Sequence, residues 1–220
     1  MKTNSIRVGC HDVFRAFLVN NATFDSELEI PVINPISEIP KKLIPFSKAI
    51  KSHDYNCYVH FYEDDVNFER VWNSPKTYLP ILKKFSGVIS PDFSLYRDMP
   101  LVMQYWNTYR GKALGHWFQE NGINVIPNVR YGDRRTFLVS CAGIPKHGII
   151  SIGSYGCIKI KKDRLIFEEG LSFVINQLQP STIIIYGATP ESIFKKYKDA
   201  GITIIQFDSD YATKHQKAVG

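Results

Sequence analysis

The sequence lacks a long apolar run, because no uninterrupted stretch approaches the roughly 18 residues that a membrane-spanning helix requires. Its first ten residues contain no apolar signal region, which argues against secretion. No C-x-x-C pair occurs among the cysteines, which are Cys10, Cys57, Cys141 and Cys157. Widely spaced cysteines favour free thiols in a reducing compartment over a disulfide framework. We therefore expect a cytoplasmic protein without a membrane segment.

The sequence also lacks the common short motifs of catalysis and nucleotide binding. It contains neither the G-x-x-x-x-G-K-[ST] spacing of a P-loop nor the G-x-G-x-x-G spacing of a dinucleotide site. No serine occupies a G-x-S-x-G elbow, and no cysteine has a histidine nearby in a catalytic pattern. These absences disfavour the common nucleophilic hydrolases. They leave open whether the protein is an enzyme.

What the sequence does contain is the composition of a globular protein with a mild positive charge. Hydrophobic residues make up 44% of its 220 residues, and the net charge is +6. A positive field favours anionic partners, either a small molecule or a nucleic acid. The densest basic stretch lies at 159–164, where the alternation of 158–161 favours an exposed strand edge over a nucleic-acid surface.

Residues 1–55 differ in pattern from the rest of the chain. Prolines recur there among aliphatic residues, at Pro31, Pro35, Pro40 and Pro45. Each proline disfavours a regular helix or a central strand, yet the aliphatic content is too high for a disordered tail. The pattern predicts a proline-rich arm that packs on a single main domain formed by residues 56–220.

From residue 56 onward, short apolar strands alternate with helices. The expected strands are 57–62, 88–89, 123–126, 148–152, 182–186 and 202–207. Helices are expected after Ser74-Pro75, after Pro100, before Pro180 and after Thr189-Pro190. Residues 137–141 fit either a strand or a short helix. Continuous apolar strands connected by helices predict an α/β fold with a mostly parallel sheet of about six strands covered by helices. The sequence leaves open a partial (β/α)-barrel or a doubly wound sheet, with a slight preference for the barrel.

The helix after Pro100 has the clearest apolar stripe in the chain. Val102, Trp106, Tyr109, Ala113 and Trp117 follow one another at steps of three and four. The same helix carries the aromatic residues Tyr105, Trp106, Tyr109, Trp117 and Phe118. At these spacings we interpret them as mostly core, because a surface for stacking nucleic-acid bases would need them exposed.

Polar side chains that follow the strands form the candidate site. Ligands of parallel α/β folds bind at the carboxyl ends of strands, where loops and helix N-termini converge. The candidates for chemistry are Asp64, Asp65, Asp92 and Arg130. The candidates for ligand binding are Asn128, Asp133, Gly153, Ser154, Tyr155, Tyr186 and Gly187.

Two chemical roles are open to the carboxylates. Asp64, Asp65 and Asp92 offer oxygen ligands for a divalent cation, or an acid and a base if burial separates their pKa values. Turn formation and helix capping explain each of them equally well. Arg130 ends an apolar strand and therefore needs a carboxylate or phosphate partner. An internal salt bridge to Asp92 or Asp65 and a bound ligand are the two alternatives.

Two glycine-containing turns are candidate anion sites. Gly153-Ser154-Tyr155-Gly156 follows a strand, and its glycines allow close backbone approach to an anion, although a plain turn also fits. Tyr186-Gly187 precedes a helix whose N-terminus would face the same space.

Several of these segments together resemble a known protein family. They are Phe61-Tyr62-Glu63-Asp64-Asp65, Phe68-Glu69-Arg70-Val71-Trp72, Ser90-Pro91-Asp92-Phe93-Ser94, residues 126–133 and residues 153–156. This set resembles the family known as domain of unknown function 4417, which is seen in bacteriophages and in mobile elements of Gram-positive bacteria. The resemblance covers most of the chain from about residue 55. It implies an intracellular accessory protein of a phage or mobile element, in the host cytoplasm if phage-encoded, and carries over no catalytic role.

Three functions fit the sequence. The first is the binding or processing of a phosphate-containing small molecule at the strand ends. The second is a nucleic-acid-associated accessory role in replication or recombination, which predicts strongly salt-dependent binding. The third is inhibition of a host enzyme through an exposed apolar patch. The sequence does not specify a cofactor, although a divalent cation fits the carboxylates, and it leaves the oligomeric state open.

Overall fold

The structure, a computed structural model, describes residue 12 and residues 14–209. Cys10 lies outside the described residues, as do the first ten residues, on which the prediction about a signal region rests. Within the part that is described, no helix combines the length and the apolar character needed to cross a bilayer.

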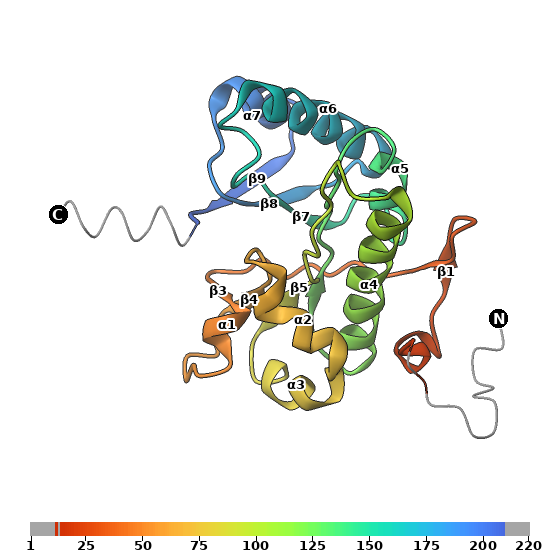
Figure 1. The fold of residues 1–220 in the computed structure, drawn as a ribbon. Helices are drawn as coiled ribbons and strands as arrows, with labels where there is room; N and C mark the ends of the chain where they lie inside the picture. Colours follow the sequence, from red (N-terminus) through yellow and green to blue (C-terminus); the bar gives the residue numbers. More distant parts are fainter. Residues whose placement is uncertain (1–11, 13, 210–220) are drawn as a thin grey trace.

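The parallel strands form two sheets. The first pairs β3 (Leu43–Pro45), β4 (Tyr58–His60), β5 (Gly87–Ile89) and β6 (Val125–Ile126) in that order, and the second pairs β7 (Ile149–Gly153), β8 (Thr182–Tyr186) and β9 (Thr203–Phe207). Every pairing in both sheets is parallel. Figure 1 shows the two sheets in different halves of the molecule, with β7–β9 above and β3–β5 below. The predicted α/β fold with mostly parallel strands is therefore confirmed.

Within the described part of the chain, a single isolated backbone bridge joins the two sheets. It pairs Asn128, just after β6, with Ser151 in β7. Two hydrogen bonds form it, from Val129 N to Ser151 O (2.8 Å) and from Ser151 N to Pro127 O (2.9 Å). The strands therefore follow one another in chain order, whereas a doubly wound sheet reverses its order at a switch point. The order is that of a barrel, but β9 and β3 are not paired in the described chain, so the barrel is not closed.

One apolar cluster fills the space that the strands surround. Its buried members come from five different strands and are Tyr58, Ile89, Ile126, Ile149 and Ile184. Leu43 lies in β3 and Ile205 lies in β9, the two edge strands that do not pair with each other. Both side chains are only partly buried against the cluster. Exposure thus increases toward the open side of the barrel, where no further strand covers the interior.

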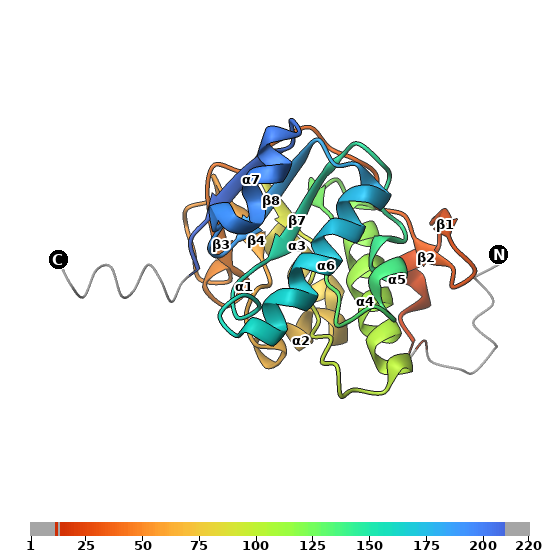
Figure 2. The ribbon, with the colours of Figure 1, turned by 90° about the horizontal axis from the view of Figure 1, so that it is seen from above.

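The helices pack outside the strands. They are α1 (Phe46–Ala49), α2 (Asp65–Asn73), α3 (Pro75–Leu82), α4 (Leu101–Glu120), α5 (Phe137–Cys141), α6 (Lys161–Leu178) and α7 (Glu191–Asp199). Figure 2 shows α6 and α7 lying over β7 and β8. Helix α3 starts at Pro75 and α7 directly after Pro190, as predicted from proline at helix starts.

Three local expectations were wrong or incomplete. Residues 65–73 form α2, a helix absent from the expected elements, although its buried Phe68, Val71 and Trp72 recur at helical spacing. Residues 43–45 of the arm form β3, at an edge of the sheet, where proline is tolerated. Residues 158–160 precede α6, which begins at Lys161, so the expected strand edge at 158–161 does not exist.

The N-terminal segment packs against α4 and the loop that follows α5. It contains a short 3-10 helix, η1 (Ala16–Val19), and an antiparallel pair, β1 (Phe24–Asp25) and β2 (Ile30–Pro31). Ile33 N donates to Gly143 O (2.9 Å), and Gly143 N donates to an Asp25 carboxylate oxygen (2.9 Å). Ile33 is fully buried and contributes to the largest apolar cluster.

Gly170 brings α6 close to the loop that follows β6. A Cβ at this buried helical position would overlap the ring of Tyr131. We expect Gly170→Ala to lower the free energy of unfolding by about 1–3 kcal/mol through this clash, although alanine favours helices. Urea denaturation would measure the change. At the control position Gly148, a Cβ would make only ordinary contact with Pro35, so Gly148→Ala should have little effect. Equal stability of Gly170→Ala and the parent protein would contradict the close packing.

Candidate functional site

Asp92, just after β5, is the centre of a buried polar network. Its side chain is almost inaccessible, and each carboxylate oxygen has its own donor. Asn128 Nδ2 donates to Oδ1 at 2.6 Å, and Arg130 Nη1 donates to Oδ2 at 3.3 Å. Both donors follow β6, the neighbouring strand. The loops leaving two parallel strands therefore meet. Of the alternatives left open for Arg130, the internal salt bridge to Asp92 is formed.

The network continues across the strand ends through Tyr62 and Ser151. The Tyr62 hydroxyl lies 2.9 Å from Asn128 Oδ1 and 2.7 Å from Ser151 Oγ. Because Asn128 Nδ2 donates to the carboxylate, its Oδ1 can only accept, so Tyr62 donates its single proton there. Ser151 Oγ lies within hydrogen-bond distance of both the Tyr62 hydroxyl and Ile184 O (3.2 Å), and its one proton serves either acceptor. The bonds of Tyr62 and Asn128 orient the Asn128 amide toward the Asp92 carboxylate.

Burial sets the protonation of this network. Desolvation raises the pKa of Asp92, and this is opposed by Arg130 and by the hydrogen bond from Asn128. The pKa of Arg130 is raised mainly by Asp92, so the guanidinium keeps its charge. Burial also raises the pKa of Tyr62 well above its ordinary value. The hydroxyl therefore remains a proton donor at neutral pH.

Helix α4 turns a polar face toward this network. Lys112 is 3% exposed, and its Nζ donates to Asn128 O at 3.2 Å. Burial lowers the pKa of this amine to about 7. Arg110, also buried, donates to Asn107 Oδ1 (2.7 Å) and to Glu69 (2.5 Å). The helix covers the loops after β5 and β6, whose exposed backbone groups require polar neighbours.

This polar face changes the interpretation of the apolar stripe. Of the five aromatic residues interpreted as mostly core, Phe118 is buried, and Tyr105, Tyr109 and Trp117 are partly buried. Trp106 is 41% exposed, so the prediction does not hold there; Val102, at the start of the stripe, is 73% exposed. Trp106 instead packs edge-on against Trp72 of α2 and stacks on Tyr109.

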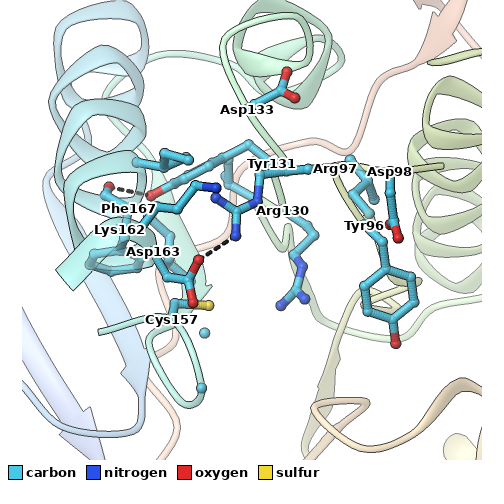
Figure 3. A pocket seen from close by; sticks show the side chains of 17 residues that line it. Tyr96, Arg97, Asp98, Arg130, Tyr131, Asp133, Cys157, Lys162, Asp163 and Phe167 are labelled. Carbon is cyan, nitrogen blue, oxygen red and sulfur yellow. Dashed lines mark hydrogen bonds and ion pairs between the residues drawn. The ribbon is translucent and has the colours of Figure 1, made fainter. Parts of the chain in front are cut away.

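A pocket of about 670 Å³ opens beside Arg130. Its walls come from the loop before α4, the loop after β6, the loop after β7 and the first two turns of α6. Figure 3 shows the Arg130 guanidinium projecting between the walls, with Tyr96, Arg97 and Asp98 on one side and Lys162 and Asp163 on the other. The three cations that line it are Arg97, Arg130 and Lys162, and the three carboxylates are Asp98, Asp133 and Asp163.

Most of these charges already have partners. Arg97 forms an ion pair with Asp163, and Asp133 is bound by Arg135 at 2.8 Å. Lys162 has no ion-pair partner among the described residues, and Arg130 uses one nitrogen for Asp92. The remaining donors of Arg130 and the ammonium of Lys162 are the cationic groups left for a ligand.

The structure divides the predicted site residues into three groups. Arg130, Asp133 and Gly153 line the pocket. Asp92 and Asn128 lie behind Arg130 and hold it. The third group, which does not line the pocket, consists of Asp64, Asp65, Ser154, Tyr155, Tyr186 and Gly187.

The two acidic residues before α2 behave differently from each other. Asp65 accepts hydrogen bonds from Ser94 N (3.1 Å) and from Ser94 Oγ (2.8 Å), and thereby fixes the loop after β5. It is also close enough to Arg130 to raise the pKa of that guanidinium. Asp64 occupies the N-cap position of α2, is exposed and makes no side-chain capping bond.

The turns after β7 and β8 support each other. Ser154 Oγ donates to Ala188 O (2.8 Å), and Gly187 has a positive φ of 118°. A Cβ at Gly187 would lie 2.6 Å from Ser154 Oγ, so glycine is required by this contact. Tyr186 stacks on Tyr62 with ring centroids 4.9 Å apart. Tyr155 is 46% exposed, at the rim of the turn.

The carboxylates that could have held a divalent cation are not grouped. Among the described residues, no three side chains of histidine, cysteine, aspartate or glutamate lie so as to hold a metal ion. Asp65 and Asp92 each accept hydrogen bonds from other residues, and Asp64 is exposed. Cys57, Cys141 and Cys157 are free thiols, as expected.

Sequence reasoning missed several residues of the site. Lys112 was hidden within a helix treated as apolar, although a lysine beside Ala113 and Leu114 on a buried helix is a usable signal. Tyr62 was also missed, although it ends the expected strand 57–62, and residues at strand ends are where the site was sought. The approach of Arg97 to Asp163 depends on how a loop and a distant helix cross, and no local pattern shows it.

The sequence is similar to one protein family and to proteins of two phages. The model of the family described as "Domain of unknown function (DUF4417)" matches residues 22–208. "Gene 1 protein" of Mycobacterium phage D29 is 34% identical over 166 residues, which are 74% of this chain and 61% of that protein. "Gene 1 protein" of Mycobacterium phage L5 is 34% identical over 171 residues, 75% of this chain and 74% of that protein. The chain thus spans less than two thirds of the D29 protein. No solved structure matches significantly.

Proposed function

Because this chain belongs to the DUF4417 family, whose description names no activity, we propose a function from the site alone: binding of a phosphate-containing small molecule in the pocket beside Arg130. The pocket lies at the carboxyl ends of β5, β6 and β7, where parallel α/β folds bind their ligands. Binding is the part that the geometry supports, and a reaction at this site is not assigned.

The observation that carries the proposal is the state of Arg130. Its side chain is 29% exposed, and Asp92 engages one nitrogen at 3.3 Å from behind. The other N–H groups have no acceptor among the described residues, and they face the pocket (Figure 3). A guanidinium that is charged, fixed and only partly paired is the usual protein group for phosphate oxygens.

Lys162 supports the same assignment. It lies in the first turn of α6, a helix of 18 residues whose N-terminus carries a partial positive charge. Lys162 and Arg130 approach the pocket from different elements. An anion between them would contact both cations without displacing Asp92.

The other two hypotheses remain predictions. The basic stretch at 159–164 is divided between a loop and the start of α6, so it offers no regular charged strand. Val102 and Trp106 are exposed near the start of α4, which is the kind of apolar surface that a protein partner would contact. Neither feature specifies a partner.

Replacing Arg130 with glutamine tests the proposal. Titration calorimetry with inorganic phosphate should show binding to the parent protein and a loss of affinity of about tenfold to a hundredfold in Arg130→Gln, because a charge-assisted hydrogen bond contributes about 1.5–3 kcal/mol. The matched control is Arg134→Gln, a nearby arginine whose side chain is 81% exposed and does not line the pocket. Equal affinity in the two variants, or no binding to the parent protein, would refute the proposal.

A further inference from the structure

Arg97 and Asp163 connect opposite walls of the pocket. Arg97 lies on the loop before α4, and Asp163 lies in the first turn of α6. The ion pair between Arg97 Nη2 and Asp163 Oδ1 therefore crosses the pocket, as Figure 3 shows. Both side chains remain partly exposed, at 38% and 25%. A ligand that enters the pocket meets this ion pair.

The backbone that carries Arg97 is fixed independently of the ion pair. Arg135 Nη2 donates to Arg97 O at 3.0 Å. Arg135 Nη2 also donates to Asp133 Oδ2 at 2.8 Å. This attaches the loop before α4 to the loop that carries Arg130. The side chain of Arg97 can therefore change its partner by rotation, without movement of the loop.

Asp163 has a favourable interaction besides the ion pair with Arg97. A carboxylate in the first turn of a long helix is stabilised by the partial positive charge of the helix N-terminus. Partly exposed ion pairs contribute little net stability, because solvent screens them and the side chains lose rotamer freedom. Replacing Asp163 by a ligand anion as the partner of Arg97 therefore costs little free energy.

Three cations from three elements surround the same space. Arg130 comes from the loop after β6, Arg97 from the loop before α4, and Lys162 from α6. A carboxylate offers two oxygens, whereas a terminal phosphate offers three oxygens and about two negative charges. Three convergent cations match the phosphate better than the carboxylate.

We propose that Arg97 is a ligand-binding residue held in reserve by Asp163, and that it transfers to a terminal phosphate monoester of the ligand on binding. This inference rests on the proposed function, because it concerns the same pocket. In the empty protein Asp163 keeps Arg97 across the pocket. In the complex Arg97, Arg130 and Lys162 share the phosphate oxygens, and Asp163 remains at the helix N-terminus.

The experiment is a double-mutant cycle of Arg97→Gln and Asp163→Asn, titrated calorimetrically with inorganic phosphate at pH 8. We expect Arg97→Gln to weaken phosphate binding about tenfold, because one charge-assisted contact is lost. Asp163→Asn should tighten it about fivefold by releasing Arg97. In the Arg97→Gln background the same Asp163→Asn change should have almost no effect, because no arginine remains to be released. Arg97→Lys should recover part of the affinity.

The outcomes separate this inference from the proposed function. If Asp163→Asn tightens binding equally with and without Arg97, the carboxylate acts only by repulsion, and the transfer is overturned while phosphate binding stands. If acetate binds the parent protein as tightly as phosphate does, the choice of a phosphate end group is overturned. If phosphate does not bind the parent protein at all, the proposed function and this inference fail together. Matching thermal unfolding midpoints would show that the variants are folded.

Discussion

Lys112→Met is expected to make the protein more stable at pH 7, by about 1–4 kcal/mol, although it removes a hydrogen bond. Lys112 is 3% exposed, and among the described residues its Nζ donates to one acceptor, Asn128 O, although an ammonium has three N–H donors. Protonation would place a charge there without a carboxylate partner. A methionine of similar length fills the same volume without that cost.

The effect should depend on pH in a defined direction. Burial lowers the pKa of Lys112 from 10.5 to about 7, and Cys141 nearby opposes this only in part. Between these two values the unfolded chain binds one proton more than the folded protein. The free energy of unfolding therefore rises with pH across this window, by about 1.4 kcal/mol per unit, and the contribution is lost as the pH falls from 10.5 toward 7. Lys112→Met should remove this slope.

Urea denaturation of both proteins between pH 7 and 9 would measure the slope, in a range below the ordinary pKa of tyrosine. Lys51→Met is the matched control, because Lys51 is exposed and its replacement leaves α4 unchanged. The same pH dependence in the parent protein and in Lys112→Met would show that the buried amine does not titrate in this window.

Asp92→Ala is expected to destabilise the protein by about 2–4 kcal/mol. The carboxylate accepts from Asn128 at 2.6 Å and from Arg130 at 3.3 Å, and its removal leaves both donors without an acceptor. Because the Arg130 side chain is 29% exposed, water can replace part of what is lost there. The Asn128 amide is buried and has no such compensation.

The conservative variant Asp92→Asn separates charge from hydrogen bonding. It retains an oxygen for the Asn128 amide and should cost about half as much in unfolding free energy as Asp92→Ala. Both variants should weaken phosphate binding, since Arg130 loses the group that orients it. A denaturation midpoint for Asp92→Ala within error of the parent protein would contradict the central role of this carboxylate.

The parts of the fold that the sequence predicts are those with strong local signals. Three consecutive isoleucines in β8 and the Thr189-Pro190-Glu191 start of α7 each determine their element almost alone. The strand-end rule brought Asp92, Asn128 and Arg130 together correctly, since it depends only on parallel strands and their loops. β3 was missed because it contains a proline and gains its structure by pairing with β4. α2 was missed although Phe68, Val71 and Trp72 recur at helical spacing, because nine residues are a short signal.

The rest of the site depends on tertiary geometry. Tyr62 reaches Asn128 and Ser151 only because β4, β6 and β7 curve around a common interior. Arg97 and Asp163 are 66 residues apart and meet only after α6 has packed beside the loop before α4. The buried face of α4 is polar because it covers loops, and periodicity alone does not distinguish loops from strands beneath a helix.

The single bridge between Asn128 and Ser151 has a mechanical consequence. The same two residues form the joint between the halves of the molecule and, through their side chains, the support of Asp92 and Arg130. If the pocket binds an anion as proposed, a change that disrupts this bridge should also weaken anion binding, because Asn128 serves both the bridge and the Asp92 carboxylate.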